Sequence, residues 1–345
     1  MNNLLLTFDY ELPLGGVKND YRDALFEPTN QLMEWAETGN LSIVFFVDIL
    51  CYVQCKKLQI DYFTVPFKKQ VQEMIQRGHD VQLHIHPHWL DTKILNNHFE
   101  TDAPFSLSDY PDEEIDNIIS LAVQELTKIA KEVEPNYQCL AFRAGGYNFG
   151  SKMELICRIL YQQGIRFDSS IANGYYFKSD TSEVDYRNFN PMPNGFVPFS
   201  KSDTSSINRL FEIPIASKPK SLFEIPTFIK VRWFAHRSVN RGIMIHTQNK
   251  LNFLSKLRKL LSFRMFTVDN HTFSHTYLNS ILDHHFRKYR KNSDISCALI
   301  GHPKAMGVYS FELLTQLVQT IQKESRQNIT ITNFTLLYKQ NIYKI

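Results

Sequence analysis

The sequence predicts an α/β protein in which a largely parallel sheet forms a barrel. Short apolar runs alternate with helical patterns through the first half of the chain, which is typical of strand-helix-strand units. Polar residues directly follow several of these runs, and active sites of parallel α/β barrels lie where the strands end. The chain has 345 residues, 43% hydrophobic and 21% charged, which suits a globular protein with a large core and excludes disorder, collagen and coiled coil.

The individual elements are predicted from apolar runs and from residues that start or stop helices. Strands are expected over residues 4–8, 42–47, 80–86, 140–143, 165–168, 211–214 and 296–300. Helices are expected over residues 27–39, 65–77, 112–133, 152–163 and 311–324. Pro28 suits the first turn of the first helix, whereas Gly39, Gly78 and Gly164 suit the left-handed position past a helix end.

The second half of the chain departs from this alternation. From residue 175 to about residue 208 it is polar and rich in Ser, Asp, Asn and Pro, and stretches of this kind are usually functional or disordered. Between residues 210 and 285, beyond a first strand, the segment is basic and rich in Phe, and no element is predicted. We expect one domain over residues 1–345 with an insertion over the barrel mouth at about residues 175–295.

Charge and cysteine content exclude several classes of protein. Lys and Arg number 38 against 35 Asp and Glu, a net charge of +3, so nothing demands nucleic acid or membrane lipid as a partner. The basic run at 287–291 is typical of a solvated helix face. The five scattered cysteines indicate reduced thiols. Because the first residues lack a signal-peptide pattern and no apolar run reaches about 18 residues, we expect a cytoplasmic protein without a transmembrane segment.

Two carboxylates stand at the end of the first strand. Asp9 and Glu11 are two residues apart, so they are expected to point the same way. Two acids on one face repel each other unless a cation or a proton lies between them. The pair therefore indicates a site, although acids at strand ends also occur as helix caps or surface residues.

Four histidines lie in ten residues at the third strand, one just before it and the others in it and in the loop after it: His79, His84, His86 and His88. Alternation along the strand places the last three on one face. Imidazole is the commonest nitrogen ligand of zinc, and three rings on one face can converge on one ion. We therefore expect a metal site at this strand end.

Two further strand ends carry reactive side chains. Arg143 ends the fourth strand, where its guanidinium can hold a carboxylate in a bidentate pair, and Gly145 beyond it allows close backbone approach. His302 follows the strand at 296–300 in the same way. Because parallel strands end at one face of a barrel, we expect the acids, the histidines and the arginine to meet there.

These residues, in this order, resemble the NodB-like polysaccharide deacetylases, carbohydrate esterase family four, from residue 4 to about residue 310. TFDYE is similar to the family's TFDDG motif, VFFVD to its TFFV strand, GHDVQLHIHPH to GHEIGxHxxxH, FRAGGY to RxPxG, and LIGHPK to its final histidine motif. The spellings HIHPHW, RAGGY and GHPKA resemble a subgroup associated with bacterial surface-polysaccharide biosynthesis, O-antigen or capsule. The resemblance implies a distorted (β/α)7-type barrel that removes an N-acetyl or other acyl group from an amino sugar or glycan.

The resemblance also implies a role for each matching residue. Asp9 corresponds to the general base, Arg143 to the arginine that orients it, and His302 to the general acid for the leaving amine. His84 and His88 correspond to ligands of a divalent metal, zinc in the first place and cobalt or nickel as alternatives. Such an ion lowers the pKa of bound water and polarises a carbonyl, while the base and the acid move the protons.

Other residues near the motifs are assigned supporting roles. Asp168 is expected to orient a catalytic histidine or the substrate. Tyr10, Trp89, Gly145 and Tyr147 are expected to contact the substrate, since they adjoin the motifs. Aromatic faces stack on sugar rings, and packing in the core explains the aromatic residues equally well.

One position departs from the family pattern. Tyr10 stands where the family has its metal-binding aspartate, so either Glu11 or His86 completes the ligand set, or no metal is bound. Some members of the fold that this chain resembles begin with DxE and hydrolyse cyclic amides such as allantoin without metal. The presence of both His84 and His88 favours a metal site.

Three functions therefore stay open: a metal-dependent deacetylase, a metal-independent amidohydrolase acting on a cyclic ureide or imide, and an inactive glycan-binding module. The set of Asp9, Arg143 and His302 disfavours the last of these. A second histidine pair, His271 and His275 in HTFSH, spells a family motif but comes after the arginine motif. We do not expect this pair to bind the metal.

Overall fold

The barrel is the central feature of the computed structural model, which describes residues 1–13, 21–95, 98–100, 106–178, 182–187, 210–221, 263–269, 274–291, 294–323 and 328–343. Seven parallel strands follow one another in the order β10-β7-β6-β3-β2-β1-β13. Ile215, just after β10, forms a parallel bridge with Ala298 of β13. The sheet therefore curls round until its two edges meet, as the strand-helix alternation predicts.

The strands of this sheet are β1 (Asn2–Tyr10), β2 (Val44–Asp48), β3 (Asp80–Ile85), β6 (Ala141–Ala144), β7 (Phe167–Asp168), β10 (Phe211–Glu212), β13 (Ile295–Gly301) and β14 (Ile329–Thr332), which pairs with the start of β1. Antiparallel ribbons are formed by β4 (Lys93–Leu95) with β5 (His98–Glu100), β8 (Tyr176–Lys178) with β9 (Glu183–Asp185), and β11 (Ser217–Pro219) with β12 (Phe263–Met265). The central strands are buried on both faces, which explains why they read as continuous apolar runs.

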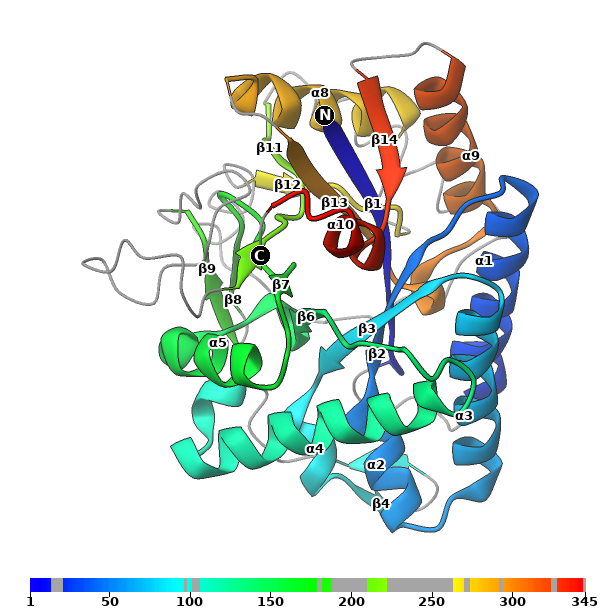
Figure 1. Cartoon of the computed structure of the whole chain (residues 1–345), viewed down its shortest axis with the longest axis vertical. Helices are drawn as coiled ribbons and strands as arrows, with labels where there is room; N and C mark the ends of the chain where they lie inside the picture. The colour runs from blue at the N-terminus through cyan, green and yellow to red at the C-terminus, as the bar shows by residue number, and fades with distance from the viewer. Residues whose placement is uncertain are drawn as a thin grey trace.

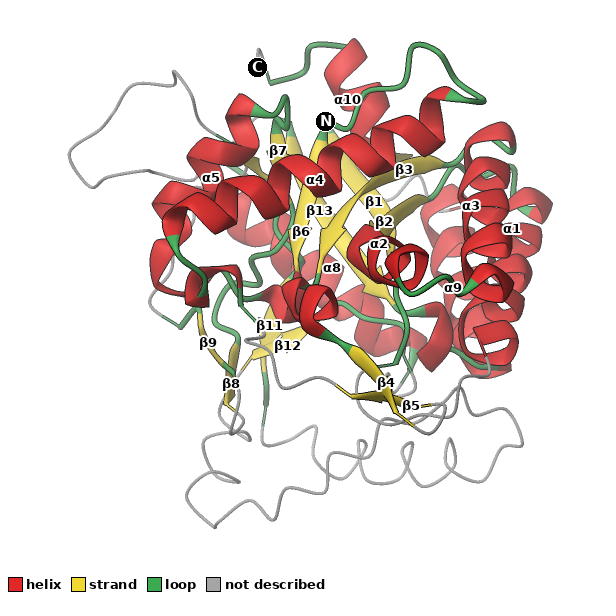
Figure 2. Cartoon of the chain, turned by 90° about the horizontal axis from the view of Figure 1, so that it is seen from below, coloured by secondary structure: helices red, strands yellow, loops and turns green. Residues whose placement is uncertain are grey.

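Helices surround the strands, as Figures 1 and 2 show. They are α1 (Glu27–Thr38), α2 (Ile49–Lys57), α3 (Asp61–Gln76), α4 (Asp112–Lys131), α5 (Met153–Gln162), α8 (His275–Tyr289), α9 (Val308–Lys323) and α10 (Phe334–Lys339). The longest of the described helices, α4, buries the apolar stripe that its sequence predicts, including Ile115, Ile119 and Leu126. None of the described helices is both long and apolar enough to cross a membrane.

The sequence prediction matches most elements of the barrel and misses a few outside the apolar pattern. Helix α2 follows β2 without a break and is buried nearly all round, so it lacks a clear amphipathic stripe. Helix α10 is held by a distant residue, because Asp80 accepts hydrogen bonds from the backbone N–H groups of Phe334 and Thr335.

Much of the predicted insertion lies outside the described residues, and the single-domain assignment stays a prediction. The five cysteines are buried and free.

Candidate active site

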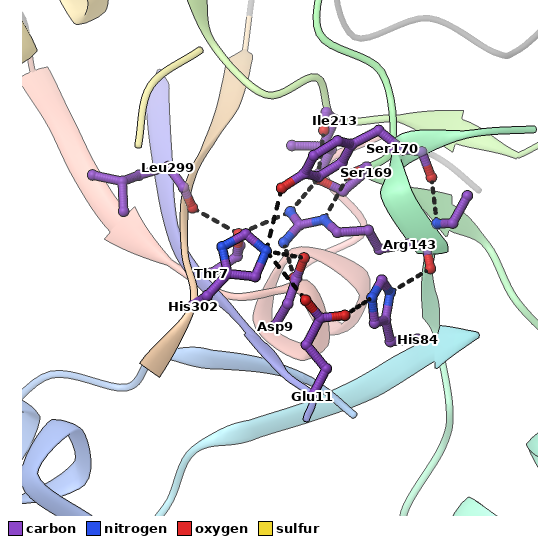
Figure 3. Close-up of polar contacts among 12 residues, drawn as sticks. Thr7, Asp9, Glu11, His84, Arg143, Ser169, Ser170, Ile213, Leu299 and His302 are labelled. Carbon is purple, nitrogen blue, oxygen red and sulfur yellow. Dashed lines mark hydrogen bonds and ion pairs between the residues drawn. The ribbon is translucent and has the colours of Figure 1, made fainter. Parts of the chain in front are cut away.

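Five side chains expected at the site come from the carboxyl ends of four strands and face one another (Figure 3). Asp9 and Glu11 lie at the end of β1, His84 on β3, Arg143 on β6, and His302 directly after β13. The first four are buried, and the His302 side chain is 17% exposed. Parallel pairing brings these strand ends to one face of the barrel, as the sequence predicts.

Arg143 holds Asp9 in place. Its Nη1 donates a hydrogen bond to Asp9 Oδ1 at 2.6 Å. Its Nη2 donates to Thr7 Oγ1 and Ser169 Oγ, its Nε donates to the carbonyl oxygen of Ser169, and its guanidinium lies over the ring of Phe46. A guanidinium with this many partners has one available orientation. Asp9 is therefore fixed through one carboxylate oxygen, and the other, Oδ2, lies 3.5 Å from Nε2 of His302.

Glu11, His84 and His86 form a group whose ligand atoms all lie within 4.8 Å of one another. Oε2 of Glu11 is 3.1 Å from Nε2 of His84 and 2.6 Å from Nε2 of His86. Nδ1 of His84 donates to the carbonyl oxygen of Arg143 at 2.8 Å, because a carbonyl only accepts. The Nε2 lone pair of neutral His84 thus faces a carboxylate, and a proton or a metal ion has to lie between them.

The charges around Glu11 keep this carboxylate ionised. Burial raises its pKa, but Lys304, His86 and His84 together lower that pKa well below the ordinary value. Nζ of Lys304 donates to Glu11 Oε1 at 2.8 Å. Burial lowers the pKa of His84, and the neighbouring Asp9 and Glu11 carboxylates raise it above its ordinary value. Glu11 is therefore a buried carboxylate that has a lysine on one oxygen and two histidines on the other.

His302 is held by Asp269. The backbone N–H of His302 donates to Asp269 Oδ1, and its Nδ1 donates to Oδ2, both at 2.8 Å. Its Nε2 lies 3.5 Å from Asp9 Oδ2 and from Glu11 Oε1, and 3.4 Å from the hydroxyl of Tyr147. Burial lowers the pKa of His302, but Asp269, with help from Asp9 and Glu11, raises it to about 9. The ring is therefore protonated at neutral pH, with an N–H aimed at the two carboxylates.

Comparison with known proteins places this fold among solved structures. No family model and no curated protein matches the sequence. A proposed polysaccharide deacetylase from Mycobacterium smegmatis superimposes with a TM-score of 0.50 at 11% identity, over 99% of this chain and 91% of that one. The allantoinase PuuE superimposes with a TM-score of 0.50 at 10% identity, over 99% of this chain and 90% of that one.

The chain has the fold of the NodB-type polysaccharide deacetylases. Sequence identities this low establish the fold and nothing finer, and the fold is shared with an allantoinase. The activity within the deacetylase fold therefore has to be argued from the side chains of the site.

The histidines of the GHDVQLHIHPH motif do not pair as the family's HxxxH spacing implies, which would join His84 with His88. His86, expected as an alternative ligand, stands with His84, whereas His88, expected as a ligand, lies outside the group. Strand β3 ends at Ile85, and Pro87 starts a 3-10 turn, so the alternation of the strand no longer applies to His88. Burial, together with neighbouring positive charges, lowers the pKa of His88 to about 3.

Gly145 and Trp89 support the histidines, and their expected contact with substrate stays a prediction. A Cβ atom on Gly145 would lie 2.6 Å from the carbonyl oxygen of Ile85 and 2.7 Å from Nδ1 of His86, so only glycine lets this histidine ring fit. Trp89 is 3% exposed, and its Nε1 donates to Asp48 Oδ2 at 2.7 Å. The other oxygen of Asp48 accepts the backbone N–H of His86.

Of the two tyrosines expected to contact substrate, one reaches the site. Tyr10 lies between the two carboxylates on β1 and points the opposite way, where its hydroxyl donates to Gln70 and its ring packs against Phe67. It is fully buried, so its predicted contact with substrate is wrong. Tyr147 is half-buried and brings its hydroxyl to within 3.4 Å of His302 Nε2.

Asp168 does not contact His302. The role of orienting this histidine, expected for Asp168, belongs to Asp269. Asp168 instead accepts hydrogen bonds from the backbone N–H and the hydroxyl of Ser170, at 3.0 and 2.7 Å, and pairs with Glu212. Burial raises the pKa of both carboxyl groups, and the neighbouring Asp168 raises that of Glu212 further. Both carboxyl groups are fully buried, and they lie on neighbouring strands at paired positions.

The second histidine pair is absent from the site, as far as the described residues show. His275 begins α8, and its Nε2 contacts the Thr320 hydroxyl at 2.9 Å and the side-chain amide of Asn279 at 2.8 Å. His271 lies outside the described residues.

Four residues that shape the site are not expected from the sequence: Asp48, Glu212, Asp269 and Lys304. Asp48 and Glu212 end their strands, which is the same signal that identified Asp9. Lys304 directly follows the His302 motif, and Asp269 lies in a segment for which the sequence predicts no element.

Proposed function

We propose that this protein is a metal-dependent hydrolase that removes an acyl group, an N-acetyl group in the first place, from an amino sugar. One observation carries the proposal: a fixed carboxylate, an oriented imidazolium and a carboxylate-histidine group meet at the mouth of one barrel. Asp9 lies with Arg143, His302 with Asp269, and Glu11 with the two histidines. Amide hydrolysis needs a base, an acid and an electrophile in just such proximity.

The residues present suit a divalent ion. The group offers Oε2 of Glu11 and Nε2 of His84 and of His86, and three protein ligands of these types with an open position are typical of catalytic zinc. The Arg143 carbonyl fixes the His84 ring through Nδ1, which is the outer-shell contact usual for ligating histidines. When bound, such an ion lowers the pKa of water and polarises an acyl carbonyl.

The remaining groups move protons. Oδ2 of Asp9 is not bonded by Arg143 and lies 3.5 Å from His302 Nε2, so it can take a proton from an attacking water as the water oxygen bonds to the acyl carbon. His302 holds its Nδ1 hydrogen on Asp269 and presents its other N–H to the site, so it can donate that proton to the amine as the C–N bond breaks. The products are a carboxylic acid and a free amino sugar.

The substrate class is proposed from the motif spellings. HIHPHW, RAGGY and GHPKA resemble deacetylases of bacterial surface-polysaccharide biosynthesis. We propose an acylated amino sugar of an O-antigen or capsule precursor as substrate and the cytoplasm as the place of action. Tyr147 beside His302 is the aromatic residue best placed to contact such a substrate.

The test measures metal content and turnover together in three matched variants. Wild-type protein should carry about one zinc ion per chain by elemental mass spectrometry and release acetate from N-acetylated amino sugars. His84→Ala and His86→Ala should each lower zinc affinity by more than about 100-fold and abolish turnover, while His88→Ala should keep its zinc. No acetate release by zinc-loaded wild-type protein from any acylated amino sugar would oppose the proposal.

A second function is favoured by a specific contact: a metal-independent amidohydrolase acting on a cyclic ureide or imide. Lys304 already supplies a positive charge to Glu11, at 2.8 Å, so the carboxylate is balanced by the chain itself. Hydrolysis of such a ring at an undiminished rate after exhaustive chelation would select this function over the first.

A further inference from the structure

Lys304 is a buried lysine that contacts the candidate metal ligands. It lies two residues after His302, and only 2% of it is exposed. Its Nζ donates to Glu11 Oε1 at 2.8 Å and to the carbonyl oxygen of Leu12 at 2.9 Å. A buried ammonium is costly unless it is paired, so these two contacts hold the charge in place.

The two oxygens of Glu11 serve different partners. Oε2 faces the histidine nitrogens, at 3.1 Å for His84 and 2.6 Å for His86. Oε1 faces Lys304, with Nε2 of His302 further away at 3.5 Å. The carboxylate therefore offers one oxygen to an ion at the histidines while the other oxygen bonds an ammonium group.

This arrangement affects an incoming divalent cation in two ways. Lys304 compensates the charge of Glu11, so the ligand group can stay assembled without an ion. The same ammonium repels a cation bound to that carboxylate, and repulsion is strong where water is largely excluded.

We propose that Lys304 is a built-in counter-ion of Glu11 that keeps the ligand group formed without metal and weakens its affinity for a divalent cation. The inference rests on the proposed metal site at Glu11, His84 and His86. Because Lys304 weakens the affinity, we expect the ion to bind reversibly. The lysine then tunes the metal affinity of the site and does not contact substrate.

The test compares three substitutions in the full-length protein. Lys304→Met removes the charge and the donor, Lys304→Gln removes the charge but keeps a donor, and Lys304→Arg keeps the charge. Zinc affinity is measured by competition with a chromogenic chelator, and melting temperature is measured with and without zinc. The Met and Gln variants should bind zinc about 10- to 100-fold more tightly than wild type, a range typical of outer-shell changes, and the Arg variant should stay near wild type.

The melting temperature of the neutral variants should depend on zinc more strongly than that of wild type. Without metal, the Met and Gln variants should melt below wild type, because Glu11 loses its partner. Saturating zinc should raise their melting temperatures more than that of wild type, since tighter ligands stabilise more. A Lys304→Gln, His84→Ala double variant should lose the tight binding, which locates the effect at this group.

Equal or weaker zinc binding by both neutral variants would overturn the inference. If wild type still releases acetate in a zinc-dependent manner, the proposed function survives that result. Conversely, tighter zinc binding by the neutral variants with no hydrolysis of any acylated amino sugar would support the counter-ion role and refute the proposed deacetylase.

Discussion

Replacing Asp269 by asparagine should move the alkaline limit of activity down by more than two pH units. The pKa of His302 is raised to about 9, against burial, chiefly by the charge and the hydrogen bond of Asp269. An asparagine keeps a hydrogen-bond acceptor but lacks the charge. The pKa of His302 should then fall toward its ordinary value of about 6.5.

The loss of rate follows from the protonated fraction of His302. At pH 8 a group of pKa about 9 is about 90% protonated, whereas one of pKa about 6.5 is about 3% protonated. A general acid must be protonated, so the variant should lose about 30-fold in turnover at pH 8 and less than about twofold at pH 6. Acetate release from an N-acetylated amino sugar, measured from pH 5.5 to 9.5, checks this profile.

Stability should follow the same titration. Because the pKa of His302 is higher in the folded than in the unfolded state, its contribution is fully present below about pH 6.5 and is lost as the pH rises through about 9. A shift from about 6.5 to about 9 corresponds to about 3 kcal/mol of unfolding free energy. Asp269→Asn should remove most of that dependence in urea unfolding measured at pH 6 and pH 9.

A control variant and a direct measurement of the His302 pKa test the role of Asp269. Asp168→Asn should leave the alkaline limit in place, because Asp168 contacts Ser170 and Glu212 and not His302. NMR titration of histidine-labelled protein, with His302→Gln for assignment, reports the pKa itself. A wild-type value near 6.5, or a value that stays near 9 in Asp269→Asn, would falsify the assignment of Asp269.

Two further substitutions test how the site is held together. Gly145→Ala should destabilise the fold by about 1–3 kcal/mol and weaken zinc binding, because the new Cβ collides with the Ile85 carbonyl and the His86 ring; an unchanged zinc affinity from competition titration would contradict this. Arg143→Met should cost about 3–5 kcal/mol in urea unfolding, because Asp9 is left buried without its partner. Adding Asp9→Asn should recover part of that loss, and a double variant as unstable as the sum of the two singles would refute the pairing.

The residues at the strand ends are the part of the site that the sequence predicts best. Asp9, Arg143 and His302 are separated by more than a hundred residues from one to the next, yet their predicted meeting is confirmed by distances of 2.6 and 3.5 Å to Asp9. The prediction succeeds because each residue ends an apolar run, and parallel strands all end at one face. The common direction of Asp9 and Glu11 is likewise confirmed, since alternation within a strand is a local property.

Side-chain alternation predicts directions only within a strand, so it fails beyond the end of β3. The HxHxH pattern places three histidines on one face only if the strand continues through all of them. Strand β3 ends at Ile85, and Pro87 begins a 3-10 turn. The place of Tyr10 in a motif predicts contact with substrate, whereas the direction of its side chain follows from alternation along the strand and from its contacts with Phe67 and Gln70.

By itself the sequence determined the fold class, the positions of the barrel strands along the chain and the side chains that end them, because these depend on local periodicity and on the shared direction of parallel strands. Only the tertiary structure decided that Asp269 and not Asp168 holds His302, that His86 joins His84, and that a lysine balances Glu11. Those choices depend on distances between segments far apart in the chain, and no pattern within one segment records them.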